Sequence, residues 1–126
     1  MALRRTIEPN TKVYVGYPVP ADGFTLKVEV EEGKIAICGS NFLERPDCSY
    51  SPTYNWKFEV TDYTDIFLNE NGLPQTNRLD KRSAAQTEVT VYVTIEGLAL
   101  DGNITFLLNT TLGDTTIRTG IILLLL

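Results

Sequence analysis

The strongest constraint on the fold is a run of alternating side chains at residues 87–113. Between residues 89 and 95 every second side chain is valine or isoleucine, and threonine or tyrosine lies between them. A period of two places these sets on opposite faces of a half-buried β-strand. A second alternating run includes Ile104, Phe106 and Leu108. Because glycine tolerates positive φ, the intervening Asp101-Gly102 predicts a tight turn, so the two runs are expected to form a hairpin.

Further strands are predicted along the rest of the chain, each bounded by turn-forming residues. A turn at Glu32-Gly33 predicts that the strands at residues 24–31 and 34–39 pair as a hairpin. Trp56 is expected in the core because its alternation partners are apolar. The predicted strands are residues 12–19, 24–31, 34–39, 54–61, 64–68 and a last strand at 115–126.

Many short strands with no helical period predict an all-β fold. We expect an antiparallel β-sandwich of about eight strands with a jelly-roll-like order. An immunoglobulin-like order is disfavoured because such a domain would place a tryptophan between two widely spaced cysteines, whereas Trp56 follows both cysteines of this chain.

The chain of 126 residues is long enough to bury the core of a single domain. Residues 1–11 have little to bury and predict an N-terminal arm, followed by one β-sandwich domain at 12–126. This domain ends in an apolar strand, which needs burial on both faces and therefore predicts an assembly contact. The residues of that contact are Ile121, Ile122, Leu123, Leu124, Leu125 and Leu126. The apolar run is too short to span a bilayer, although it would also suit the start of a longer membrane anchor.

The two cysteines, Cys38 and Cys48, predict a disulfide that pins the loop after residue 40 onto the strand at 34–39. The alternative is a pair of reduced buried thiols. Asn103 and Asn109 each begin an Asn-x-Thr sequon and are expected on the polar face of one strand. Disulfide and glycosylation together predict an extracellular or cell-surface protein.

The composition argues against several function classes. A net charge of −5 and a pI near 4.6 disfavour a nucleic-acid partner. The chain contains no histidine, which removes the commonest general base and metal ligand. No nucleophile with a base is identified, so we expect a non-catalytic protein without a cofactor.

Two ligand sites remain as alternatives. Calcium would suit the oxygen-rich neighbourhood of Asp62, Asp65, Asn69 and Glu70, although a solvated acidic loop is the simpler interpretation. The tyrosines of the middle of the chain are a candidate sugar-stacking surface, while core packing and ordinary interface contacts are commoner roles. They are Tyr50, Tyr54 and Tyr63.

The middle of the chain resembles the bacterial pre-peptidase C-terminal type of domain and its extracellular relatives. The segments that carry the resemblance are GFTLKVEV, GKIAICGS, a loop containing Pro46, YNWKFEV and TVYVTIEG followed by Phe106. The similarity covers about residues 23–111 and lies in the strand pattern rather than in a motif. It implies a non-catalytic accessory role in a larger extracellular assembly, and no calcium ligand is carried over from it.

Two functions follow as hypotheses. The first is an extracellular structural or adhesive subunit, glycosylated and self-assembling through its terminal segments into an oligomer or a fibre. The alternative is a carbohydrate- or protein-binding accessory module of a larger secreted or surface protein, with the three tyrosines as its binding surface. An enzymatic function is the least supported.

Overall fold

The computed structural model describes residues 2–74, 88–98 and 102–115. Within these ranges the chain forms two antiparallel four-stranded sheets that pack as a sandwich, which confirms the predicted fold class. No helix in the described ranges is long and apolar enough to cross a membrane. The elements are β1 (Ala2–Ile7), β2 (Lys12–Pro18), β3 (Phe24–Glu32), β4 (Ile35–Ser40), a 3-10 turn η1 (Ser51–Thr53), β5 (Trp56–Val60), β6 (Tyr63–Leu68), β7 (Thr90–Gly97) and β8 (Ile104–Leu112).

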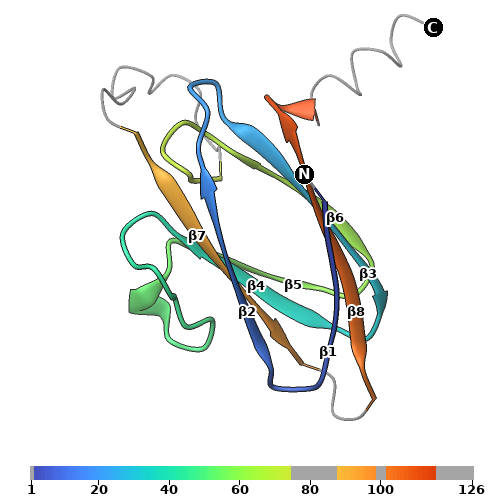
Figure 1. Cartoon of the computed structure of the whole chain (residues 1–126). Helices are drawn as coiled ribbons and strands as arrows, with labels where there is room; N and C mark the ends of the chain where they lie inside the picture. Colours follow the sequence, from blue (N-terminus) through green and yellow to red (C-terminus); the bar gives the residue numbers. More distant parts are fainter. Residues whose placement is uncertain (1, 75–87, 99–101, 116–126) are drawn as a thin grey trace, which may run out of the picture.

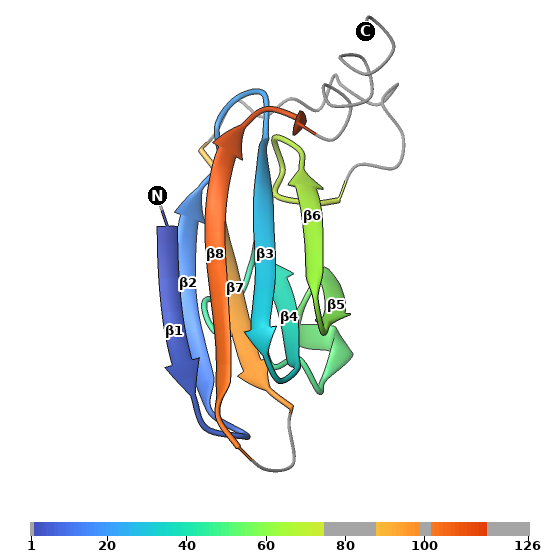
Figure 2. The same ribbon diagram turned by 90° about the vertical axis from the view of Figure 1, so that its right-hand side faces the viewer.

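The strand order is that of a jelly roll. Sheet I has the order β1-β8-β3-β6 and sheet II the order β2-β7-β4-β5. Figure 2 shows sheet I in front of sheet II, and Figure 1 shows the same sandwich from the edge at which β1 and β2 lie in front. The pairs β1·β8, β2·β7, β3·β6 and β4·β5 are nested and antiparallel, as in a long hairpin rolled into two sheets.

Both predicted hairpins are wrong, although the strands themselves are present. β3 belongs to sheet I and β4 to sheet II, so Glu32-Gly33 carries the chain across the core and does not join paired neighbours. Gly33 has φ of 90°, and a Cβ there would lie 2.7 Å from Ile104 Cγ1, so the crossing needs glycine. β7 and β8 are likewise in different sheets. Their apolar faces meet across the sandwich, because alternation determines the buried face of a strand and not its hydrogen-bonded neighbour.

The first residues differ from the predicted N-terminal arm, because residues 2–7 form an edge strand of sheet I. β1 pairs with β8 along its whole length, with Leu3 opposite Leu108 and Ile7 opposite Ile104. Ile7 is buried and Leu3 is partly buried against the core. The charged Arg5 between them breaks the apolar alternation that would have identified the strand. The predicted last strand lies outside the described residues from residue 116 onward.

The main core lies between the two sheets and contains Trp56, as predicted. The indole nitrogen of Trp56 donates a hydrogen bond to the carbonyl oxygen of Gly72 at 3.2 Å, which satisfies its only polar atom. Phe58, two residues later, is 38% exposed because β5 is an edge strand of sheet II. The largest fully buried side chains are those of Phe106, Leu26, Ile35, Ile37, Leu68, Ile95, Ile104 and Leu108.

Candidate binding surfaces

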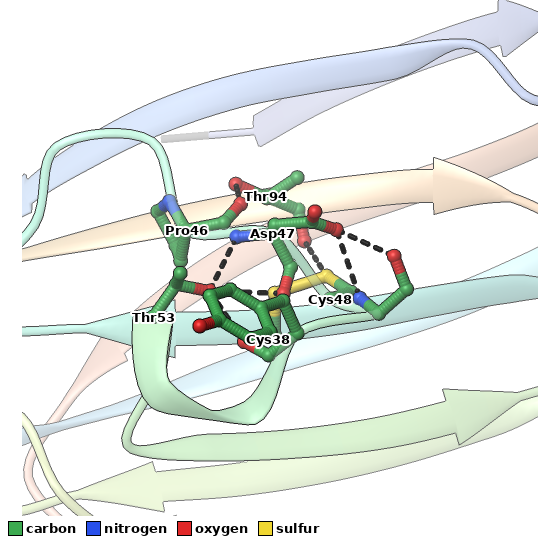
Figure 3. The surroundings of a disulfide bond; sticks show 8 residues. Cys38, Pro46, Asp47, Cys48, Thr53 and Thr94 are labelled. Carbon is green, nitrogen blue, oxygen red and sulfur yellow. Dashed lines mark hydrogen bonds between the residues drawn. A yellow bond between two sulfur atoms is a disulfide. The ribbon is translucent and has the colours of Figure 1, made fainter.

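The predicted disulfide between Cys38 and Cys48 is present, with the two Cα atoms 5.5 Å apart. Cys38 lies on β4, where Ile35 and Ile37 face the main core, so that Ala36 and Cys38 face the outside of sheet II. The disulfide therefore lies outside the main core, and the loop of residues 41–55 folds over the outer face of sheet II (Figure 3). We call these residues the disulfide loop. Both cysteines are buried in a small second cluster that includes Ala36 and is flanked by Tyr54 and Leu98.

Hydrogen bonds tie the disulfide loop to the sheet and to itself. The buried Thr94 hydroxyl on β7 donates to the carbonyl oxygen of Pro46 at 2.7 Å. The Asp47 backbone N–H donates to Thr53 Oγ1 at 2.8 Å, across the base of a tight turn (Figure 3). Asp47 Oδ1 also accepts bonds from the Ser49 hydroxyl at 2.7 Å and the Ser49 N–H at 2.9 Å. These bonds lower the pKa of the Asp47 carboxyl, chiefly through the Ser49 hydroxyl, because they favour its charged form.

The disulfide loop displays large apolar side chains from this fixed backbone. Phe42 is 59% exposed, Leu43 39% and Tyr50 60%. Ser40 Oγ accepts hydrogen bonds from the backbone N–H groups of Phe42 at 3.1 Å and Leu43 at 3.0 Å, which orders the start of the loop. Asn41 Nδ2 donates to the carbonyl oxygen of Asn71 at 2.8 Å. Sequence reasoning missed Phe42 and Leu43, whose available signal was an apolar pair outside any alternating run.

The three tyrosines of the candidate ligand surface are divided between the two sheets. Tyr50 is exposed on the disulfide loop, and Tyr54 packs against the outer cluster below it. Tyr63 is exposed on β6 of sheet I. A hydrogen bond with Asp65, together with some burial, raises the pKa of the Tyr63 hydroxyl. Tyr50 and Tyr54 thus share one surface that Tyr63 does not join.

Two of the four residues weighed as calcium ligands, Asp65 and Asn69, have side chains engaged within the protein. Asp65 Oδ2 lies 3.6 Å from Lys27 Nζ in an ion pair between β6 and β3. Asn69 Oδ1 accepts the N–H groups of Asn71 at 2.8 Å and Leu73 at 3.2 Å in the turn after β6. Over the part of the chain that the structure describes, no group of three or more His, Cys, Asp or Glu residues could hold a metal ion.

A second surface lies where the edge strands β1 and β2 face each other along one side of the sandwich (Figure 2). Partly buried apolar residues between positions 3 and 19 pack against the main core here. They are Leu3, Val13, Val15, Tyr17 and Val19. We call this set the β1–β2 seam. Burial of Tyr17 in this seam raises the pKa of its hydroxyl to about 12, because burial disfavours the charged tyrosinate.

The sequon asparagines are both exposed. Asn103 directly precedes β8, and Asn109 lies within β8. The predicted assembly residues 121–126 lie outside the described residues.

Comparison of the chain with protein-family models, with curated proteins and with solved structures gave no match. The resemblance to pre-peptidase C-terminal type domains therefore stays a prediction.

Proposed function

We propose that this domain is a non-catalytic structural subunit of an extracellular assembly, and that its copies associate by adding a strand at the β1–β2 seam. The segment that adds is the apolar run Ile121–Leu126 of a second copy. The observation that carries the proposal is the seam itself, where two edge strands lie beside incompletely buried core residues.

The seam offers both kinds of contact that strand addition uses. Among the described residues β1 and β2 each end their sheet, so one side of each has backbone N–H and C=O groups without a neighbouring strand there. Val13, Val15 and Tyr17 alternate along β2 with their side chains toward the core. An added strand would pair the backbone groups and cover these side chains at the same time.

The charge of Arg5 directs the contact toward β2. Arg5 lies between Leu3 and Ile7 on the core-facing side of β1 and is exposed. An inward-pointing charge on an edge strand opposes indiscriminate pairing. The apolar part of the seam is therefore continuous along β2 and interrupted along β1.

The apolar segment has a matching length and composition. Six residues in an extended strand span about 20 Å, close to the length of the seven-residue β2. The segment is apolar at every position, so it needs burial on both faces, which a site between the edges of two sheets would supply. The buried disulfide favours an oxidising compartment for the assembly.

Light scattering and electron microscopy of the purified chain test the proposal. We expect the intact protein to form oligomers or filaments, and both removal of residues 120–126 and the substitution Val15→Glu to yield monomers. Tyr14→Glu is the matched control, because Tyr14 neighbours Val15 but faces outward and is exposed. A thermal melt of each variant checks that the monomers remain folded. An intact chain that stays monomeric, or folded variants that assemble as before, would refute the proposal.

The disulfide loop supports the alternative of a binding module for a protein or carbohydrate partner. Its specific support is the exposure of Phe42 and Tyr50 on a loop ordered by a disulfide and by hydrogen bonds, since such preorganisation lowers the entropic cost of binding. Glycan arrays and calorimetry with Phe42→Ala and Tyr50→Ala test this alternative. Tyr63→Ala is the control on the other sheet, and no binding at millimolar sugar argues against a carbohydrate ligand.

A further inference from the structure

We propose that Asn109 carries an N-linked glycan, and that the outer face of sheet I is the glycan-bearing face that subunit contacts leave free. The assignment of a glycan to Asn109 shares with the proposed function only the extracytoplasmic compartment and does not depend on self-association. The statement that subunit contacts leave this face free rests on the proposed function.

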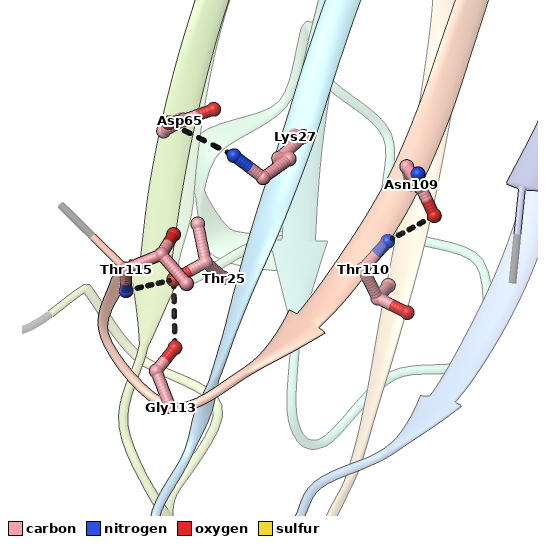
Figure 4. A network of polar contacts seen from close by, with 7 residues as sticks. All are labelled: Thr25, Lys27, Asp65, Asn109, Thr110, Gly113 and Thr115. Carbon is pink, nitrogen blue, oxygen red and sulfur yellow. Dashed lines mark hydrogen bonds and ion pairs between the residues drawn. The ribbon is translucent and has the colours of Figure 1, made fainter. Parts of the chain in front are cut away.

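The position of Asn109 on β8 suits a glycan that projects into solvent. Asn109 is exposed, whereas Leu108 before it is buried in the main core, so the asparagine points to the outer face of sheet I. Its Oδ1 accepts a hydrogen bond from the Thr110 backbone N–H at 2.9 Å (Figure 4). This local bond fixes the amide and engages its oxygen, while glycosylation uses the nitrogen.

The residues beside Asn109 leave room for a sugar. On β1 its partner in register is Ala2, the smallest side chain of that strand. On β3 its partner is Lys27, whose ammonium group is paired with Asp65 of β6 on the side away from Asn109 (Figure 4). The first sugar would therefore stand between a methyl group and a lysine that is drawn toward the far edge of the sheet.

The other end of the sequon indicates when the glycan is added. Thr111 Oγ1 is buried and has no hydrogen-bond partner in the described part of the chain. β8 is also an inner strand of sheet I, flanked by β1 and β3. A transferase that reads both residues of the sequon needs β8 unpaired, so addition precedes the closure of sheet I.

The transfer itself uses a lipid diphosphate-linked oligosaccharide as the co-reactant. Asn109 Nδ2 bonds to the anomeric carbon of the sugar, and the bond from that carbon to the diphosphate oxygen breaks. The lipid diphosphate leaves, and one amide proton passes to a base of the transferase. No residue of this chain takes part beyond the sequon.

The glycan and an added strand would extend from the subunit in different directions. Strand addition extends a sheet within its own plane, at the β1–β2 seam. A side chain on the outer face of sheet I projects away from that plane. Both can therefore occupy one subunit.

The test is secretion of the full chain from a eukaryotic host, followed by mass spectrometry before and after treatment with peptide N-glycosidase. That enzyme converts a glycosylated asparagine to aspartate, so we expect aspartate at position 109. Thr111→Val should abolish the glycan at Asn109 and still fold, because the Thr111 hydroxyl has no partner to lose. Thr111→Ser and Thr110→Val should keep it, since both preserve the sequon.

An unmodified Asn109 in secreted protein with a closed Cys38–Cys48 disulfide would overturn the assignment. Light scattering of glycosylated and enzyme-treated protein tests whether the outer face of sheet I is free of subunit contacts. We expect the same number of subunits in both samples. A rise in association after the glycan is removed would show that the outer face of sheet I is an interface. It would overturn the claim that subunit contacts leave this face free. If the chain is monomeric in both states and glycosylated at Asn109, the assembly proposal fails and the glycan assignment stands.

Discussion

The indole ring of Trp56 lies so close to the backbone of Gly39 that a Cβ atom at position 39 would be 2.2 Å from Trp56 Cζ2. The two residues are partners in register between β4 and β5. The ring is held in place by the hydrogen bond from Nε1 to the carbonyl oxygen of Gly72. Glycine is thus required on β4 because the tryptophan of the neighbouring strand occupies the space of a side chain.

Gly39→Ala should destabilise the domain by about 3 kcal/mol, at the upper end of the usual range for overpacking, because the ring cannot move without breaking its bond to Gly72. Gly16→Ala on β2 is the matched control, since a Cβ there meets Tyr92 Cδ1 at an ordinary 3.6 Å. Denaturant unfolding of both variants measures the difference. Equal free energies of unfolding would contradict the steric explanation.

Loss of the disulfide should loosen the disulfide loop and lower the global stability by about 2–3 kcal/mol, the amount expected for a short closed loop. Cys38→Ala together with Cys48→Ala is preferred to serine, because both positions are buried and would leave hydroxyl groups without partners. Hydrogen exchange should show the largest gain at residues 41–55. Unfolding of the native protein under reducing conditions is the control, and an unchanged stability would mean that the hydrogen bonds alone hold the loop.

Alternation in the sequence predicted the strands well because it is a local property. The burial of Phe24, Leu26 and Val28 on one side of β3 follows directly from their period of two. The pairing of strands could not be obtained in this way, since it depends on residues distant in sequence. Gly33 and Gly102 resemble the glycines of hairpin turns in the sequence. However, Gly33 lies between β3 and β4, and Gly102 lies between β7 and β8, and the two strands of each pair belong to different sheets.

In the candidate sites, too, the sequence predicted local features and did not predict features that depend on distant residues. The disulfide was predicted from the two cysteines of the chain, and the alternation of β4 places Cys38 on the outward face of that strand. β1 was missed because Arg4 and Arg5 interrupt its pattern and because its burial comes from β8, about a hundred residues later in the chain. The tyrosine surface failed as a unit because a sequence does not tell which sheet Tyr63 joins.

Thr94→Val should cost about 1–2 kcal/mol, because it removes a buried hydroxyl that donates to the carbonyl oxygen of Pro46 at 2.7 Å. The shape of the side chain is nearly preserved, so the loss isolates the hydrogen bond that ties the disulfide loop to β7. Thr90→Val on the same strand is the control, since Thr90 is only partly buried. Equilibrium unfolding should separate the two, and a neutral Thr94→Val would show that the bond from Thr94 to Pro46 does not contribute to anchoring the loop.

Stability at alkaline pH should depend on Tyr17 in the β1–β2 seam. Burial raises the pKa of its hydroxyl from 10.0 to about 12, so the folded protein holds this proton more tightly than the unfolded chain does. The resulting stability is fully present below pH 10 and is lost as the pH rises through about 12. Tyr17→Phe keeps the ring contact with Phe24, whose centroid lies 5.7 Å away, and removes the titrating group. Between pH 10 and 12 the free energy of unfolding of the native protein should therefore fall more steeply than that of Tyr17→Phe. Parallel curves would mean that Tyr17 titrates as it does in the unfolded chain, and hence that the seam is open to water.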